Sequence, residues 1–131
     1  MISNSHYKKL LGCHPALVAT VMQVSNKVDI AVLEALRSIS TQKRYLEQGK
    51  TKTLDSKHLK QEDGYSHAVD LAIKPIDWND TKSFIELSDL MFEESKNHGI
   101  KLRWGGDWDM DGDMTDQRFN DLVHFEINKF V

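Results

Sequence analysis

The architecture of this 131-residue chain is indicated most clearly by one segment, His67-Ala68-Val69-Asp70-Leu71-Ala72-Ile73. Large apolar side chains occupy alternate positions in it, at Val69, Leu71 and Ile73. Because side chains of a β-strand point alternately to the two faces of a sheet, the pattern predicts a strand with one face toward a core. The other face carries the Asp70 carboxylate between two alanines, and a carboxylate in such a place needs a partner when it is buried.

The sequence on both sides of this strand alternates between helical and extended patterns. Apolar residues at helical spacing and a proline in a favourable first position predict a helix that begins at Pro15. Ser40 or Thr41 is expected to cap a second helix, and Asn79 or Asp80 a long third one. The expected helices span 15–28, 40–48 and 79–98, and the expected strands span 29–36, 67–73, 100–104 and 122–127. Together they predict an α+β fold, in which a small, mainly antiparallel sheet carries helices packed on it in a single domain over residues 1–131.

Composition and charge exclude several classes of protein. The chain has the length of one domain and a formal net charge of -3, whereas a general nucleic-acid binder usually carries a strong positive excess. The single cysteine, Cys13, cannot form a disulfide within the chain, and a packed or surface thiol is favoured over a nucleophile paired with His14. No signal peptide is visible, nor any run of about 20 apolar residues that could span a membrane. The sequence therefore predicts a protein made in a cytoplasm, without a nucleic-acid partner and without membrane insertion.

Two clusters hold the side chains that could carry chemistry. One contains His58, His67 and Asp70, and the other runs from Asp121 through His124 to Glu126. A catalytic zinc site takes three ligands from histidine, cysteine or carboxylate side chains and leaves one position for water, which a neighbouring carboxylate can deprotonate. His67 lies three positions from Asp70 on the strand and should point to the opposite face, toward the core. His58 can fold back from the preceding loop and is the preferred ligand, with ordinary polar surface as the alternative for each histidine taken alone.

Three motifs in a fixed order resemble those of a known family. Ser56-Lys57-His58 followed by His67-Ala68-Val69-Asp70 is similar to the Ser-x-His…Ala-x-Asp motif of the D-Ala-D-Ala carboxypeptidase/VanY-type zinc metallopeptidases. Trp104-Gly105-Gly106-Asp107-Trp108 and Asp121-x-x-His124-Phe125-Glu126 resemble closing motifs of its L-alanyl-D-glutamate peptidase branch, which includes phage endolysins. The segment 37–53 resembles the upstream part of that branch, so the likeness covers a core of about residues 37–127.

This resemblance implies a zinc ion held by His58, Asp70 and His124. Asp121 matches the catalytic carboxylate, and Arg37 matches an arginine that holds substrate or stabilises an oxyanion, as a fixed cationic donor can. The implied reaction is hydrolysis of the L-Ala-D-Glu bond in peptidoglycan stem peptides, in which zinc polarises the carbonyl and the carboxylate passes a proton to the leaving amine. The residues expected to contact substrate are Arg37, Gln42, Ser56 and Trp104. Trp104 and Trp108 could both line the cleft, with core packing as the alternative for each.

The chain departs from the family pattern in three places. The segment between His58 and Asp70 is longer than usual because of an insertion at about residues 60–64. Ser66 stands where glycine is usual, and Val123 replaces a common proline. The insertion matters most, since the position of His58 then depends on how this loop folds.

An acidic loop indicates a second metal. Its acidic residues alternate with other residues and include a glycine at the sixth place, as at the start of a calcium-binding EF-hand loop. These carboxylates belong to Asp107, Asp109, Asp111 and Asp113. Arg118 stands where a bidentate glutamate is needed, so the motif is incomplete. The resemblance implies that this loop can bind calcium, with a solvated acidic turn as the alternative. Because neighbouring carboxylates repel one another without a cation, we expect calcium to fold the loop, orient the strand bearing Asp121 and His124, and regulate the enzyme.

The leading interpretation is a zinc-dependent peptidoglycan endopeptidase, an endolysin that cleaves L-Ala-D-Glu bonds during host cell lysis. A D-Ala-D-Ala carboxypeptidase or dipeptidase with the same metal site is the first alternative, and a non-catalytic calcium- or wall-binding module is the second. The length leaves no room for a separate wall-binding domain. Peptidoglycan is the expected partner of a monomer that is made in the host cytoplasm and reaches the wall or periplasm with the help of a phage holin.

Overall fold

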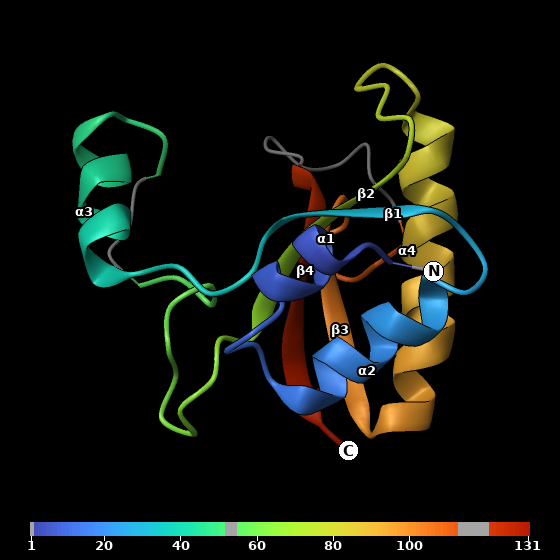
Figure 1. Cartoon of the computed structure of the whole chain (residues 1–131), viewed down its shortest axis with the longest axis horizontal. Helices are drawn as coiled ribbons and strands as arrows, with labels where there is room; N and C mark the ends of the chain where they lie inside the picture. Colours follow the sequence, from blue (N-terminus) through green and yellow to red (C-terminus); the bar gives the residue numbers. More distant parts are fainter. Residues whose placement is uncertain (1, 52–54, 113–120) are drawn as a thin grey trace.

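The computed structural model of the protein describes residues 2–51, 55–112 and 121–131. It contains a four-stranded antiparallel sheet with the strand order β1-β2-β4-β3, flanked by helices (Figure 1). The strands are β1 (Ile30–Glu34), β2 (Ala68–Ile73), β3 (Ile100–Gly105) and β4 (Asp121–Phe130). The helices are α1 (Asn4–Lys9), α2 (Pro15–Val24), α3 (Ile39–Glu47), α4 (Thr81–Ser95) and the short 3-10 helix η1 (Lys96–His98). The predicted α+β fold is confirmed.

The sheet has one apolar face and one polar face. Val69 and Leu71 of β2, together with Phe125 of β4, are fully buried in the core. Helix α4 packs on the sheet and α2 packs on α4, so these two helices form the apolar layer. Because side chains alternate along each strand, Asp70 and His124 lie on the opposite face of the sheet. The alternation predicted for β2 therefore explains why one face of the sheet is polar and the other is packed against helices.

The structure corrects several predicted boundaries. Helix α1 is not predicted by the sequence, because six residues are too few to show helical periodicity. Helix α2 ends at Val24 instead of residue 28, and Ser38 caps α3 instead of Ser40 or Thr41. Strand β1 is shorter than the predicted 29–36, whereas β4 is longer than the predicted 122–127. The hydrophobic pattern thus locates each of these longer elements, while local hydrogen bonds determine where it begins and ends.

Helix α4 begins and ends largely as predicted. Asp80, one of the two expected caps, accepts a hydrogen bond from the backbone N–H of Ser83. Gly99 follows η1 with a positive φ of 71°, a conformation that glycine adopts without steric cost. In the described ranges, no helix has the length and apolar character needed to cross a membrane.

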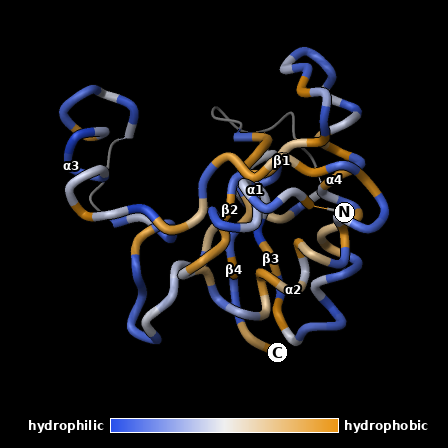
Figure 2. Tube along the Cα trace, in the orientation of Figure 1, coloured by the Kyte–Doolittle hydropathy of each residue, from blue (hydrophilic) through white to orange (hydrophobic). Residues whose placement is uncertain are grey.

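Helix α3 stands apart from the rest of the molecule in Figure 1 and is mainly hydrophilic in Figure 2. Its one buried residue is Gln42. The segment after α3 returns to the polar face of the sheet, where His58 is buried. The excursion between β1 and β2 therefore supplies side chains to the polar face and little to the core.

Cys13 is a packed thiol, only 3% exposed. Burial raises the pKa of this thiol from 9.0 to about 11, although hydrogen bonds oppose the change. Only the thiolate is a good nucleophile, so this position agrees with an inert cysteine.

We expect Cys13 to react with iodoacetamide at pH 8 at least about a hundredfold more slowly in the folded protein than in denaturant, because the raised pKa alone lowers the thiolate population about a hundredfold. Mass spectrometry of alkylation time courses, with and without denaturant, measures this ratio. Equal rates would show that the thiol is accessible and that its burial is not maintained in solution.

Candidate functional site

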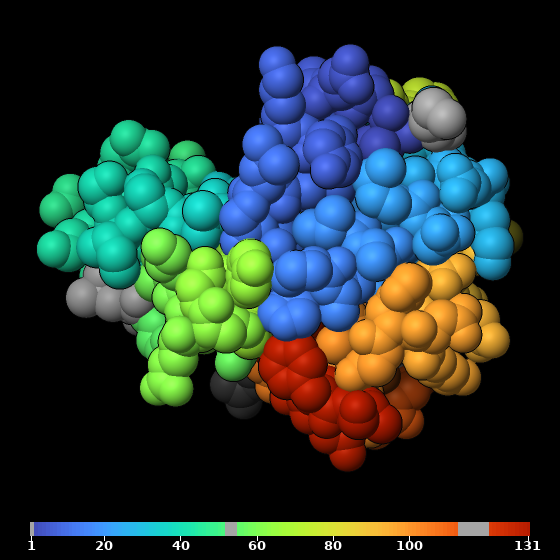
Figure 3. Space-filling model, turned by 60° about the horizontal axis from the view of Figure 1, so that its bottom comes forward, coloured from blue at the N-terminus to red at the C-terminus, as the bar shows by residue number. Residues whose placement is uncertain are grey.

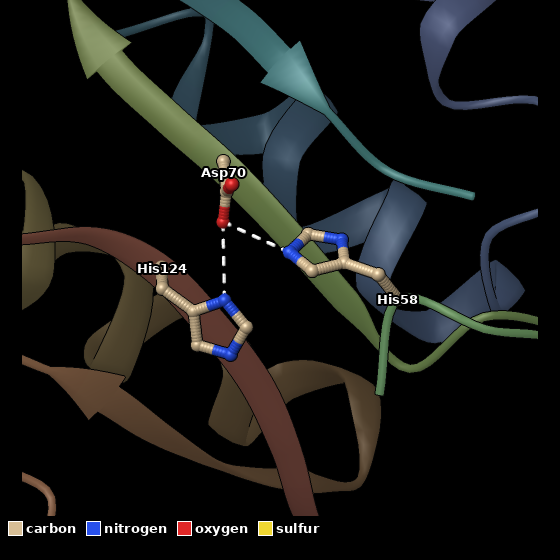
Figure 4. Close-up of side chains that lie close together, drawn as sticks. All are labelled: His58, Asp70 and His124. Atoms are coloured by element: carbon tan, nitrogen blue, oxygen red, sulfur yellow. Dashed lines mark hydrogen bonds and ion pairs between the residues drawn. The ribbon is translucent and has the colours of Figure 1, made fainter. Parts of the chain in front are cut away.

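Three side chains converge on the polar face of the sheet (Figure 4). Asp70 of β2 and His124 of β4 are directly opposite each other in the antiparallel ladder, so their side chains share a face. Oδ1 of Asp70 lies 3.1 Å from Nδ1 of His124 and 3.1 Å from Nε2 of His58. One potential ligand atom from each residue lies within 4.8 Å of the other two. The structure thus brings together the three residues that the sequence analysis assigns to zinc.

His58 is held in place by a turn. The backbone N–H of Leu59 donates to the carbonyl of Ser56 at 3.0 Å, and the hydroxyl of Ser56 accepts from the N–H of His58 at 3.2 Å. The carbonyl of His58 accepts from the N–H of Arg37 at 2.8 Å, which ties the turn to the segment after β1. The longer loop between His58 and Asp70 therefore leaves the histidine next to the carboxylate.

His67 lies outside this group, as the strand geometry predicts. Its Nε2 lies 2.7 Å from Oδ2 of Asp63, and its ring packs edge-on against Phe130. His67 was expected to point into the core, but it is only partly buried. Strand β2 begins at Ala68, so His67 lies before the strand and its side chain does not follow the alternation of inward and outward positions. The geometry favours His58 over His67 as the partner of Asp70.

Each histidine of the group has a second acceptor on its outer ring nitrogen. Nδ1 of His58 lies 2.8 Å from the carbonyl of Ala35, and Nε2 of His124 lies 2.9 Å from Oε1 of Glu126. A neutral imidazole carries one N–H, so these contacts hold that hydrogen on the outer side and turn a lone pair of each ring toward Asp70. Two nitrogen lone pairs and a carboxylate that face one another repel, and a cation or a proton between them removes this repulsion. The donor set and its outer contacts fit a divalent metal that favours imidazole, such as zinc.

Hydrogen bonds within this group shift the pKa values of its members. Burial would lower the pKa of His124, but hydrogen bonds to Asp70 and Glu126 outweigh burial and raise the pKa to about 9. Burial would raise the pKa of Asp70, but hydrogen bonds from His124 and His58 hold it far below the usual range. The pKa of Glu126 is lowered in the same way, against burial, by His124 and by Arg103, whose Nη2 donates to Glu126 at 2.8 Å. These hydrogen bonds thus favour a protonated His124 between two ionised carboxylates.

Asp121 is the first residue of β4 and lines the same cleft. Burial and the negative charge of Asp70 raise the pKa of its carboxyl, although His124, His58 and Arg37 oppose the rise. A raised pKa suits a carboxyl that must both take up and release a proton. Gly105 pairs with Asp121 across the hairpin, and a Cβ at Gly105 would lie 2.1 Å from the carbonyl oxygen of Asp121. The glycine is thus required for β3 to approach the residue proposed for proton transfer.

Arg37 follows β1 and also lines the cleft. Its Nε donates to Oε1 of Glu34 at 2.9 Å, its Nη2 bonds the same oxygen, and its Nη1 donates to Oε1 of Gln42 at 2.7 Å. The guanidinium carbon lies 4.8 Å from the centroid of the Tyr45 ring. Gln42, expected to contact substrate, is 1% exposed, is not among the residues that line the cleft, and accepts a hydrogen bond from Arg37.

The cleft around these residues has a volume of about 1130 Å³ and includes Ser56 and Trp108. The ring of Trp108 lies 5.4 Å from that of His124 and is also approached by the guanidinium of Arg103, at 5.4 Å. Trp104, predicted to contact substrate, is instead 4% exposed in the core, where its Nε1 donates to the carbonyl of Leu122. Its position does not support that prediction, because Trp104 belongs to the packed face of β3. Trp108 is the tryptophan in the cleft.

Glu126 and Arg103 support His124 through hydrogen bonds. The sequence places Glu126 in the second cluster without indicating what it contacts, and gives no indication of Arg103. One signal was available. Glu126 follows His124 by two residues on a strand, so alternation places both side chains on the same face. The partnership with Arg103 depends on how β3 pairs with β4, which a strand pattern alone does not determine.

Comparison with known proteins decides the family. Residues 1–128 match the family model of the phage L-alanyl-D-glutamate peptidases. The chain belongs to this family. It is 30% identical over 95 residues to an L-alanyl-D-glutamate peptidase of Escherichia phage T5, across 68% of this chain and 66% of that relative. It also resembles the crystal structure of the L-Ala D-Glu endopeptidase ChiX of Serratia marcescens, with a TM-score of 0.76 and 25% identity over 97% of this chain and 90% of the other. The resemblance carried by the motifs is confirmed.

The acidic loop of this phage-type peptidase follows β3. Carboxylate oxygens of Asp107, Asp109 and Asp111 lie within 4.8 Å of one another. Oδ2 of Asp107 accepts from the N–H of Gly112 at 2.7 Å, and burial together with hydrogen bonds shared with Asp109 and Asp111 raises the pKa of Asp107. Asp113 lies outside the described residues. The described part of the loop thus gathers three of the four predicted calcium ligands.

Metal binding by this peptidase should be coupled to pH. Because His124 has a pKa of about 9 without metal and must lose its proton to coordinate, we expect zinc binding at pH 7 to release about one proton. The apparent affinity should rise about tenfold per pH unit from pH 6.5 to 8.5 and level off above the pKa. Competition with a chromophoric chelator measures this slope. An affinity that does not change over this range would show that His124 is already neutral or is not a ligand.

Proposed function

We propose that this protein is a zinc-dependent endopeptidase that hydrolyses the L-Ala-D-Glu bond of peptidoglycan stem peptides. The observation that carries the proposal is the convergence of His58, Asp70 and His124 in a large cleft, in a chain whose family is named for this bond. Relatives from a phage and from Serratia bear the same activity in their names. A site with three protein ligands that faces a cleft matches catalytic zinc, which needs an open position.

The proposed mechanism uses the groups around this site in distinct roles. Bound zinc would supply a Lewis acid that polarises the scissile carbonyl and activates water. Asp121 accepts the proton of the attacking water and delivers it to the amine of the leaving D-Glu residue. The guanidinium of Arg37, fixed by Glu34 and Gln42, stabilises negative charge that develops on the carbonyl oxygen. Trp108 provides an apolar wall for the substrate, and Ser56 offers a hydroxyl at the rim.

The decisive experiment is digestion of purified peptidoglycan by the zinc-loaded protein. We expect peptides with new D-Glu amino termini, identified by mass spectrometry. Released D-Ala would instead indicate the carboxypeptidase alternative. Binding to the wall without any new terminus would indicate the non-catalytic alternative, and either result would overturn the proposal.

Substitution of His124 by alanine should abolish both zinc binding and cleavage, because it removes a proposed ligand and the hydrogen bond between His124 and Glu126. Elemental analysis and the peptidoglycan assay measure the two losses together. The control is His67→Gln, which alters a histidine just before β2 that lies outside the metal group; this variant should retain about one zinc per chain. If His67→Gln lost zinc and His124→Ala kept it, the ligand assignment would be wrong.

Asp121→Asn separates proton transfer from metal binding. The amide cannot take up the proton, so we expect kcat to fall by about 10²–10⁴ while zinc content stays at the wild-type level. Steady-state kinetics on a soluble stem peptide, with zinc measured on the same samples, provides the test. A variant with wild-type kcat would exclude Asp121 as the acid-base group.

We also propose that calcium binds the acidic loop as a regulator. Three clustered carboxylates repel one another, and a cation would remove that repulsion. The acidic loop follows β3, and Gly105 of β3 pairs with Asp121, so a cation bound to the loop would also constrain the start of β4. Calorimetric titration of the zinc-loaded protein should detect calcium binding that is lost in Asp109→Asn, with cleavage increasing as calcium is added. Absence of binding in the wild type would leave the solvated acidic turn as the correct interpretation.

A further inference from the structure

Lys57 is placed at the cleft by the turn that places His58. The hydrogen bond from Leu59 N–H to the Ser56 carbonyl makes Lys57 and His58 the two central residues of that turn. The carbonyl of Lys57 accepts from the N–H of His67 at 2.8 Å, which fixes the backbone on the other side. Lys57 lines the cleft, and its side chain is exposed. A cationic side chain is thus anchored on a rigid backbone next to a metal ligand.

The lysine and arginine side chains of the cleft differ in whether they contact another side chain. Four lysine and arginine side chains line the cleft: Arg37, Lys50, Lys57 and Arg103. Arg37 is paired with Glu34 and Arg103 with Glu126, while Nζ of Lys50 lies 5.3 Å from the centroid of the Tyr45 ring. Within the described ranges, the ammonium of Lys57 has no ion pair, hydrogen bond or ring contact. A cation in this situation is available for a ligand.

The chemistry of the cleaved bond identifies a complementary group. In an L-Ala-D-Glu bond the glutamyl residue contributes its amine, so both of its carboxyl groups lie on the leaving side. The peptide continues through one of them, and the other stays a free carboxylate. A lysine ammonium binds such a group as a point charge with three donors. We propose that Lys57 binds the free carboxylate of the D-Glu residue and so selects substrates in which this group is not amidated.

This inference rests on the proposed function and deepens it. A competing explanation is that Lys57 only adds positive charge, which would attract any anionic wall material regardless of the glutamyl group. The two explanations differ in which substrate is affected. A specific contact discriminates between a carboxylate and an amide of almost the same shape, whereas a general charge effect changes binding of every anionic substrate.

The test compares two soluble stem peptides that differ only in a free carboxylate or a primary amide on the D-Glu residue. The wild-type protein should prefer the free carboxylate by roughly threefold to tenfold in kcat/KM, mainly through KM, and salt should weaken this preference. In Lys57→Met the ratio should fall toward one, and in Lys57→Arg much of it should remain. Lys60→Met is the matched control, because Lys60 is an exposed lysine of the same loop that does not line the cleft. It should keep the wild-type ratio.

Circular dichroism and zinc content of each variant show whether it folds and holds metal. An unchanged ratio in Lys57→Met would overturn the inference, as would an equal loss with both peptides in a folded, zinc-loaded variant. An identical loss of preference in Lys60→Met would assign the effect to general charge. Cleavage of neither peptide by the wild type would overturn the proposed function and this inference with it, so the two failures are distinguishable.

Discussion

The cross-strand pair of Asp70 and His124 is the constraint on which the candidate site depends. The two residues face each other because β2 and β4 pair in one particular register. A shift of that register by one residue would turn one of them toward α4 and bring Val69 or Phe125 to the polar face. The packed side of the sheet therefore fixes the site: the fully buried Val69, Leu71 and Phe125 cannot move to the other face without losing their burial.

The free-energy cost of burying His58, Asp70 and His124 is offset by hydrogen bonds to the residues around them. Oε1 of Glu126 accepts from His124, and its other oxygen accepts from Arg103 on β3, so charge is compensated across the sheet. Ala35 supplies a carbonyl to His58 from the segment after β1. A buried polar network is stabilising when each member is satisfied, and costly when one partner is removed. This explains why residues outside the group of three, such as Glu126 and Ala35, belong to the description of the site.

The sequence predicts the fold and the convergence of His58, Asp70 and His124 better than it predicts where Gln42 and Trp104 lie. Alternation along β2 places Asp70 opposite the core, and the separation of His67 from Asp70 already argues against that histidine. Trp104 and Trp108 cannot be distinguished in this way, because both lie in one motif and only the pairing of β3 with β4 shows that Trp104 is packed on Phe125. Gln42 is polar and was assigned to substrate, yet it is buried against Arg37. Such assignments depend on contacts between distant segments, which single-sequence patterns do not contain.

The long loop between His58 and Asp70 raises the question of how an insertion leaves the site intact. Its Asp63 carboxylate is held by His67 at 2.7 Å and faces Nε2 of His14 at 3.8 Å, and both rings pack on Phe130. In Figure 3 this loop, in light green, lies against the blue segment that contains His14. Nδ1 of His14 accepts from the N–H of Ala16, so its neutral ring carries the hydrogen on Nε2 and presents a donor to Asp63. A ring in that state cannot offer a lone pair to a metal, so these residues form a hydrogen-bonded anchor and not a second metal group. The extra residues are tied to α2 and to the end of β4, away from His58, which is why the turn at Ser56–Leu59 can keep its place beside the sheet.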